Sequence, residues 1–227
     1  MAFVQARLGS SRLPGKVLLK IKGKTVLERV IWRLRAACTV EGVIVLTTTL
    51  DEDDAIVLEA ERLEAPVHRG PELDVLKRFQ QASRRFRPEI IIRATADNPL
   101  IDVGSVDRIV RAIRSSGLDF CQENGLPVGG ATEAVTAKAL EKADLESRDP
   151  SHREHVTLYV KEHLEKFRVA FLSPPDALCR PDLRITVDTP ADFLFVEDLI
   201  GALSEGASPT PLEHYLRIAE AMIRARA

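Results

Sequence analysis

The amino-acid sequence predicts a three-layer α/β fold in which helices cover both faces of a mostly parallel central sheet. Short apolar runs rich in β-branched residues alternate with segments in which apolar residues recur every three or four positions. Such an alternation of strand and helix requires crossover connections and therefore a parallel sheet. The chain has 227 residues, 45% of them hydrophobic and 29% charged, which suits one large α/β domain with a buried core.

The first half of the chain supplies these elements in regular order. Apolar runs predict strands at 2–4, 43–46 and 90–95, with a shorter edge strand at 67–70. Helical periodicity predicts helices at 25–37, 53–63, 75–86 and 103–113. Three aspartates stand where the last three of these helices begin and are expected to cap them: Asp53, Asp74 and Asp102.

The order loosens after Gly117. Three glycines and a proline at 125–130 predict a flexible stretch, and an insertion over the carboxyl edge of the sheet is expected around 118–175. The remaining expected elements are a helix at 151–163, strands at 167–172 and 183–187, a helix at 190–203, a linker at 207–211 and a C-terminal helix at 211–227.

The loop after the first expected strand reads VQARLGSSRLPGK. Gly9 and Gly15 can adopt backbone conformations closed to other residues, so successive N–H groups can turn toward one anion. Arg7 and Arg12 add planar forks of donors, and Lys16 adds a compact positive charge. A solvated basic turn would explain these charges but not the glycines, serines and proline between them. The loop therefore predicts a binding site for nucleotide phosphates.

Two common phosphate-binding motifs do not fit this loop. A Walker loop has four residues between its glycines and a hydroxyl residue after its lysine, whereas here five residues separate the glycines and Val17 follows Lys16. A dinucleotide-binding turn needs GxGxxG at the start of a helix, and that spacing is absent.

Two aspartates stand just past predicted strands, Asp97 after 90–95 and Asp188 after 183–187. Open α/β sheets bind ligands at this carboxyl edge. One or two carboxylates together with phosphate oxygens form a ligand set that suits Mg²⁺. Each aspartate also belongs to an Asp-x-Pro turn, in which the side chain commonly bonds its own downstream backbone. Taken singly each is a turn former, but the pair predicts a magnesium site.

Composition argues against several classes of protein. The formal charge is only -2, from 32 basic and 34 acidic residues, so no nucleic-acid partner is expected. No apolar run approaches the roughly 20 residues that cross a bilayer, and no signal-like segment precedes the first strand, so no membrane partner is expected. Cys38, Cys121 and Cys179 lack a CxxC pair and are expected to be reduced thiols of a cytoplasmic protein. The oligomeric state, a homodimer included, is left open.

The glycine-containing loop also resembles a known signature. The run QARLGSSRLPGK followed by Leu27-Glu28-Arg29 resembles cytidylyltransferase-type sugar nucleotidyltransferases, in particular the family of the spore coat polysaccharide biosynthesis protein SpsF, relatives of the CMP-sialic acid and CMP-KDO synthetases. The resemblance covers most of the chain, because shorter matches follow in the family's order at 53–56, 69–76, 95–102, 154–157 and 186–190.

This resemblance implies the Rossmann-like nucleotidyltransferase (GT-A-like) fold and a Mg²⁺-dependent transfer of CMP from CTP to an acceptor sugar, with release of pyrophosphate, in surface polysaccharide or glycoconjugate biosynthesis. The catalytic residues that it implies are Arg12, Lys16, Asp97 and Asp188, the two aspartates as metal ligands. The nucleotide-binding residues that it implies are Gln5, Ala6, Arg7, Gly9, Ser10, Arg12, Lys16, Arg69, Asp74, Thr95 and Asp97. For Arg69 and Asp74, a surface arginine and a plain helix cap are the alternatives.

The acceptor side matches the family less closely. The resemblance assigns Glu133, Glu154 and His155 to the acceptor, but Ala131 replaces an aspartate of the family's GLDVEV stretch and Ala96 replaces the glycine of its TGDxP motif. A zinc site at the histidines of 151–163 is not expected, since no third ligand lies nearby in the sequence. Two other functions stay open: a uridylyl- or guanylyltransferase acting on a sugar 1-phosphate, and a non-catalytic nucleotide-binding protein on the same fold.

Overall fold

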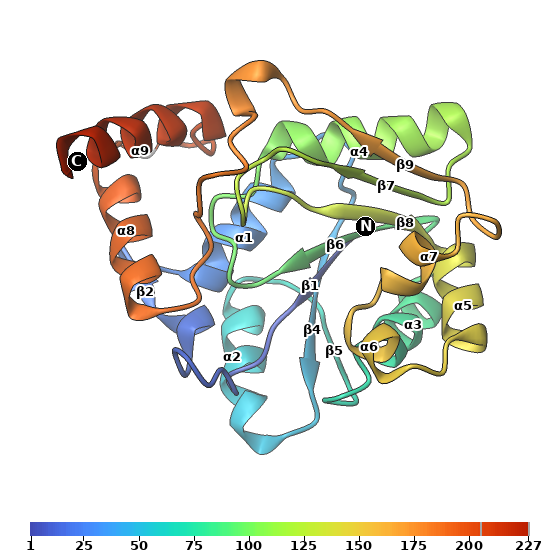
Figure 1. Cartoon of the computed structure of the whole chain (residues 1–227). Coiled ribbons are helices and arrows are strands. Elements are labelled where there is room, and N and C mark those ends of the chain that lie inside the picture. Colours follow the sequence, from blue (N-terminus) through green and yellow to red (C-terminus); the bar gives the residue numbers. More distant parts are fainter. Residues whose placement is uncertain (205, 227) are drawn as a thin grey trace.

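The computed structural model describes residues 1–204 and 206–226 and contains a seven-stranded sheet with helices on both faces (Figure 1). The strands of this sheet are β1 (Ala2–Gln5), β4 (Val43–Thr48), β5 (Val67–Gly70), β6 (Ile90–Thr95), β7 (Phe120–Glu123), β8 (Glu133–Thr136) and β9 (Val169–Leu172). Their order across the sheet is β5-β4-β1-β6-β8-β7-β9. Only β8 runs antiparallel to its neighbours, so the predicted mostly parallel sheet is confirmed.

Two helical layers and a hairpin complete the structure. The helices are α1 (Val26–Arg35), α2 (Asp54–Arg62), α3 (Val75–Phe86), α4 (Val103–Ser116), α5 (Ala137–Glu146), α6 (Pro150–Glu154), α7 (Leu158–Glu162), α8 (Pro190–Gly201) and α9 (Leu212–Arg226). Strands β2 (Lys20–Ile21) and β3 (Lys24–Thr25) form the hairpin, and 3₁₀ turns lie at Lys16–Leu18, Asp51–Asp53 and Asp176–Leu178. None of the described helices is both long and apolar enough to cross a membrane.

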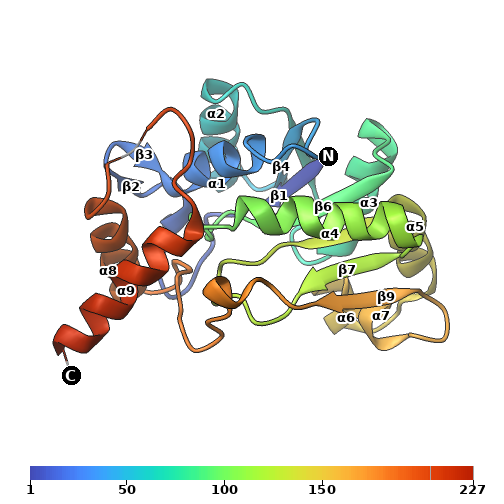
Figure 2. The same cartoon turned by 90° about the horizontal axis from the view of Figure 1, so that it is seen from above.

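Side-chain alternation along the strands divides the core into two layers. On β4, Val43 and Val45 point toward the layer of α1 and α4, whereas Ile44 and Leu46 point toward the layer of α3 and α5. All four side chains are buried. The two layers are seen on opposite sides of the sheet in Figure 2.

A third apolar cluster joins α8, α9 and the hairpin at one side of the molecule (Figures 1 and 2). Lys22 of the hairpin donates to the carbonyls of Gly201 and Leu203, which closes the C-terminal end of α8. Arg33 of α1 donates to the carbonyl of Thr210 at 2.9 Å, so the segment before α9 is fixed to the main core.

The helix starts expected in the first half are largely confirmed. The side chains of Asp74 and Asp102 accept hydrogen bonds from the third amide of α3 and α4. Asp53 precedes α2, but its side chain does not cap that helix, so this cap prediction is wrong. The final helix begins one residue later than expected, and residue 227 lies outside the described part of the chain.

The insertion expected around 118–175 contains two strands, β7 and β8, that the sequence did not predict. Residues 125–130 connect β7 to β8, and β8 lies between β6 and β7. Both strands are short and carry a buried acid, Glu123 and Glu133, each paired with an arginine from a neighbouring element. Such charges interrupt the apolar pattern by which buried strands are predicted. Helix α5, which follows β8, was also not expected.

Two further elements differ from the prediction. The helix expected at 151–163 is broken into α6 and α7, because the chain turns at His155 and buries Val156 and Thr157 between them. The strand expected at 183–187 does not form; this extended segment makes one isolated bridge, between Val128 and Arg184. The three cysteines, all within the described residues, are free thiols.

Candidate active site

The carboxyl ends of β1 and β6 open into a cleft of about 940 Å³. One wall is the loop of residues 7–16, called the phosphate loop below, and the opposite wall includes the end of α6. The cleft is lined by most of the site residues that the sequence predicted: Gln5, Ala6, Arg7, Gly9, Ser10, Arg12, Lys16, Thr95, Asp97, Glu154, His155 and Asp188. Residues from four distant parts of the chain therefore meet in one place.

Lys16 bridges the two predicted metal ligands. Its Nζ lies 2.6 Å from Asp97 Oδ2 and 2.7 Å from Asp188 Oδ1, and the residue is only 8% exposed. The two aspartates are brought together by the backbone, since the amide of Val187 donates to the carbonyl of Asp97 at 2.8 Å. This backbone hydrogen bond, with a longer one from the Thr186 hydroxyl to the same carbonyl at 3.4 Å, places Asp188 in the absence of the expected strand.

Asp188 carries two further cationic contacts. Arg12 Nη2 lies 3.2 Å from its Oδ1, and Arg184 pairs with its other oxygen. Burial alone would raise the pKa of Asp188, but the hydrogen bond and charge of Lys16, with the charges of Arg12 and Arg184, outweigh it and lower the pKa. This carboxylate therefore stays ionised at neutral pH.

The donor set fits a divalent cation that also takes phosphate oxygens as ligands. Asp97 and Asp188 both contact one ammonium nitrogen, so their oxygens converge on a single cationic point. Among the described residues no group of three histidine, cysteine or carboxylate side chains could hold a metal. Two carboxylates with phosphate oxygens and water are the ligands that Mg²⁺ commonly takes in such sites.

Asp53 connects the start of the phosphate loop to the end of β4. Its Oδ1 accepts the amide of Leu8 at 2.8 Å, and its Oδ2 accepts both the amide and the hydroxyl of Thr48 at the end of β4. The Asp53 side chain is fully buried, so the start of the loop is fixed to the sheet. This role replaces the helix cap that the sequence predicted.

The amide of Ser10 is used within the loop. It donates to the carbonyl of Leu8 at 2.7 Å, and the Ser10 hydroxyl accepts the amide of Leu13 at 3.4 Å. Gly15, at φ 68°, adopts the left-handed conformation before the turn that carries Lys16. The Ser10 amide is therefore occupied within the loop in this conformation, whereas Lys16 lines the cleft.

Three predicted site residues do not line the cleft. Arg69 donates to the carbonyls of Thr48 and Leu50 at 2.8 and 2.7 Å and so holds the loop after β4. Asp74 caps α3 and accepts two hydrogen bonds from Arg153 of α6, at 2.9 and 2.8 Å. In this structure both residues support the walls of the site.

Glu133, the third of these residues, lies at the centre of an ion-pair network. It accepts from Arg93 at 2.8 Å, from Lys161 at 2.8 Å and from the hydroxyl of Thr157 at 2.7 Å. Burial alone would raise the pKa of Glu133, but the charges of Arg93 and Lys161 outweigh it and lower the pKa to about 2. The residue that reaches the cleft from this network is Arg93, which also donates to Gln5 Oε1 at 3.1 Å.

Arg93 and Arg78 are cleft residues that the sequence reasoning missed. Arg78 donates to the carbonyls of Pro71 and Glu72 and shapes the loop between β5 and α3. A sequence signal existed for both arginines. Arg93 interrupts an otherwise apolar central strand, and Arg78 stands on the apolar stripe of α3, where a charge needs a partner.

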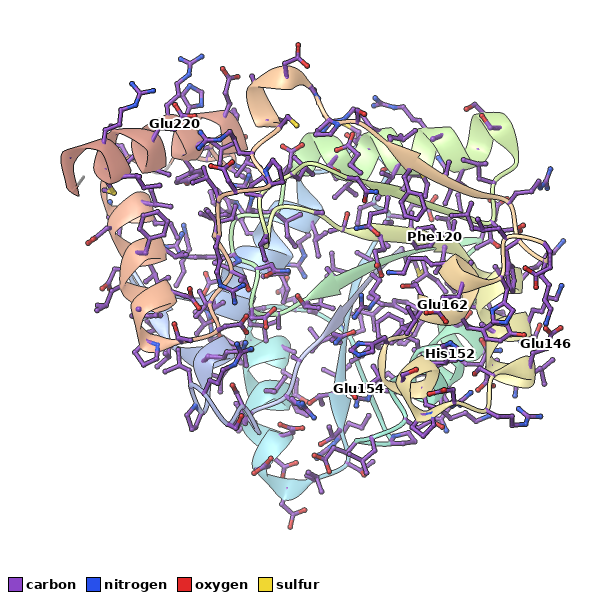
Figure 3. All side chains as sticks on the ribbon, in the orientation of Figure 1. Phe120, Glu146, His152, Glu154, Glu162 and Glu220 are labelled. Carbon is purple, nitrogen blue, oxygen red and sulfur yellow. The ribbon has the colours of Figure 1, made fainter. Side chains whose placement is uncertain are left out.

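Helix α6 presents different residues to its two sides. Glu154 and the adjoining His155 line the cleft, and their assignment to the acceptor stays a prediction. His152 instead pairs with Glu162 at 2.7 Å and contacts the ring of Tyr159 on α7. Figure 3 shows Glu154 on the side of β1, and His152 and Glu162 on the side of α7.

The chain is similar to known proteins over most of its length. The family model described as cytidylyltransferase matches residues 1–221. The spore coat polysaccharide biosynthesis protein SpsF of Bacillus subtilis is 32% identical over 213 residues, which cover 92% of this chain and 87% of that protein. An uncharacterized protein of Methanocaldococcus jannaschii is 39% identical over 198 residues, covering 87% of this chain and 82% of that one.

A solved structure extends the match to the whole fold. The structure of a cytidylyltransferase from Leptospira borgpetersenii superposes with a TM-score of 0.87 at 30% identity. It covers 99% of this chain and 94% of the other. The superposition therefore includes β8 and the C-terminal helices as well as the first half of the chain.

Proposed function

Since the chain belongs to the cytidylyltransferase family, we propose that it transfers CMP from CTP to an acceptor sugar with the release of pyrophosphate. We assign the product to surface polysaccharide or glycoconjugate biosynthesis. One observation carries the chemical part of this proposal: Lys16 lies against Asp97 and Asp188 beneath a phosphate loop that also presents Arg7 and Arg12. This arrangement suits a triphosphate above a pair of metal-binding carboxylates.

The reaction consists of one displacement at phosphorus. An acceptor hydroxyl forms a bond to the α-phosphorus, the bond to the bridging oxygen breaks, and pyrophosphate leaves with the negative charge. The hydroxyl proton passes to solvent or to an adjacent carboxylate. Such a step depends on positioning and charge neutralisation more than on a protein nucleophile.

The protein residues divide this work between them. Arg12 and Lys16 bind the phosphates whose charge grows as pyrophosphate leaves. Asp97 and Asp188 would hold Mg²⁺, which would neutralise phosphate charge and favour the ionised form of the acceptor hydroxyl. Glu154 and His155 lie across the cleft from the phosphate loop and are assigned to the acceptor.

Arg93 is added to the acceptor side, with Glu133 behind it. The guanidinium group is fixed by Gln5 and Glu133, so it presents a preset direction to the cleft. The predicted role of Glu133 thereby becomes indirect, because the carboxylate orients Arg93 instead of touching the sugar.

The test is pyrophosphate release by the full chain. Each of CTP, UTP, GTP and ATP is paired with sugars that carry a free anomeric hydroxyl and with sugar 1-phosphates, in the presence of Mg²⁺. We expect release only with CTP and a free hydroxyl, and loss of release in the Asp188→Asn variant. Release from UTP or GTP with a sugar 1-phosphate would replace the cytidylyl reaction by the alternative transferase.

A further inference from the structure

The ammonium group of Lys16 occupies the point at which the two carboxylates converge. Its contacts of 2.6 and 2.7 Å use one oxygen of Asp97 and one oxygen of Asp188. The Lys16 side chain is 10% exposed, so water screens these contacts only weakly. The same two carboxylates are those assigned to Mg²⁺, so ammonium and metal compete for one place.

The balance of charge at this point disfavours a free divalent cation. Among the described residues, three cationic side chains contact the pair of carboxylates: Lys16, Arg12 and Arg184. Arg184 is shared with the carboxylate of Asp192, which lies 3.2 Å from its Nε, so three positive charges face three negative ones. A metal ion arriving alone would have to displace the lysine and join a cluster whose carboxylates are already neutralised.

A nucleoside triphosphate changes this balance. It brings several negative charges to the phosphate loop, and Lys16 borders both that loop and the carboxylates. A lysine ammonium on a flexible four-carbon stem can turn from a carboxylate to a phosphate, which binds it at least as strongly. The carboxylates would then be free for a cation, and the phosphates would supply the ligands that two aspartates lack.

We propose that Lys16 is an internal cation that holds Asp97 and Asp188 together in the nucleotide-free enzyme and releases them when a nucleoside triphosphate binds. Divalent-cation binding is then conditional on the nucleotide. This second role of Lys16, as a positioning residue for the metal ligands, rests on the proposed function for the triphosphate but not for the transfer step.

The first experiment titrates Mn²⁺ into the nucleotide-free full chain and measures free Mn²⁺ by electron paramagnetic resonance. Lys16→Gln and Lys16→Met remove the ammonium but keep much of the stem, so the result does not depend on one variant folding. We expect both to bind Mn²⁺ at least about tenfold more tightly than the wild type. Lys138→Gln, at an exposed lysine of α5, is the matched control and should bind as the wild type does.

The second experiment measures melting temperatures with Mg²⁺ alone, CTP alone and both together. In the wild type we expect Mg²⁺ to add stability only when CTP is present, because a ligand stabilises in proportion to its binding. In Lys16→Gln, Mg²⁺ alone should raise the melting temperature. Adding Asp188→Asn to Lys16→Gln should remove that gain and so locate the ion.

The results separate this inference from the proposed function. Equal, tight Mn²⁺ binding by the nucleotide-free wild type and both Lys16 variants would overturn the internal-cation role, even if the enzyme releases pyrophosphate normally. Tighter binding by the variants would support that role even if no sugar tested accepted CMP, because neither titration needs turnover.

Discussion

The two walls of the cleft use charged side chains in opposite ways. On the phosphate loop, the Arg12 side chain is 62% exposed and makes one ion pair, so most of its donors remain open to a ligand. On the wall of β8 and α6, charged side chains pair with one another: Glu133 with Arg93, and Arg153 with Asp74. Arg12 therefore remains available to a ligand, whereas the paired side chains of the second wall hold its shape. Substitutions should change affinity in the first wall and stability or geometry in the second.

The largest effect is expected at Asp97 and Asp188, which lie beside Lys16 of the phosphate loop. Asp97→Asn and Asp188→Asn should each lower turnover by about a hundredfold or more, since metal neutralisation of the phosphates is lost. CTP binding in EDTA should survive, because Arg12 and Lys16, the residues assigned to the phosphates, are unchanged. Magnesium titrations of pyrophosphate release provide the measurement. Wild-type turnover with unchanged magnesium dependence would reduce both aspartates to turn formers.

A substitution of Arg153 tests whether ion pairs stabilise the wall of β8 and α6. Its guanidinium serves both Asp74 and Asp144, and the Asp144 side chain is only 3% exposed. Arg153→Met leaves these acids underpaired, so the free energy of unfolding should fall by about 3 kcal/mol in urea titrations.

Arg84→Met is the matched control for this change. Arg84 and its partner Glu141 on α5 are 59% and 51% exposed, so losing that pair should cost less than about 0.5 kcal/mol. Equal losses in the two variants would mean that the α6 network does not hold the wall.

Acid should weaken the same wall through Glu133. Its pKa is lowered from 4.5 to about 2 in the folded protein, so folding is favoured while the carboxylate is ionised. That contribution, on the order of 3 kcal/mol, is fully present above about pH 4.5 and is lost as the pH falls toward about 2. Urea midpoints across this range should fall more steeply for the wild type than for Glu133→Gln. Parallel curves would show that the buried network contributes nothing in acid.

Substitutions in the phosphate loop should weaken CTP binding without unfolding the protein. Arg12→Ala and Lys16→Ala each remove a charge-assisted contact to phosphate, worth about 1.5 to 3 kcal/mol, and should weaken CTP binding about tenfold or more. Titrations in EDTA measure the loss of these phosphate contacts without a contribution from the metal. Arg35→Ala, at an exposed arginine of α1, serves as the control and should bind CTP normally. Unchanged CTP, UTP, GTP and ATP binding in both variants would exclude the phosphate loop as the nucleotide site.

The smallest expected effect concerns acceptor binding, and it tests whether Glu133 acts through Arg93. Glu133→Gln should raise the acceptor KM several-fold, since Arg93 loses the carboxylate that orients it, while the KM for CTP stays nearly constant. Steady-state kinetics with each substrate varied in turn measures both. A parallel rise of the two constants would show that β8 does not serve the acceptor.

Much of the phosphate loop and of the elements around it could be predicted from local sequence. Glycine and proline positions restrict a few neighbouring backbone angles, and apolar periodicity reports which face of a segment is buried. These signals act over short stretches, and they indicated β1, the loop after it, and the capped helices α3 and α4. Arg12 and Lys16, the residues assigned to phosphate, lie in the loop after β1, which these local signals predicted.

Only the tertiary structure decided which charges meet. Insertion of β8 beside β6 pairs Glu133 directly with Arg93 across the strands, and no local pattern specifies that register. Likewise, one backbone hydrogen bond between Val187 and Asp97 sets the place of Asp188 beside Lys16. The energies of such contacts depend on burial and distance between remote segments, so they follow from the order of strands in the sheet and not from spacing along the chain.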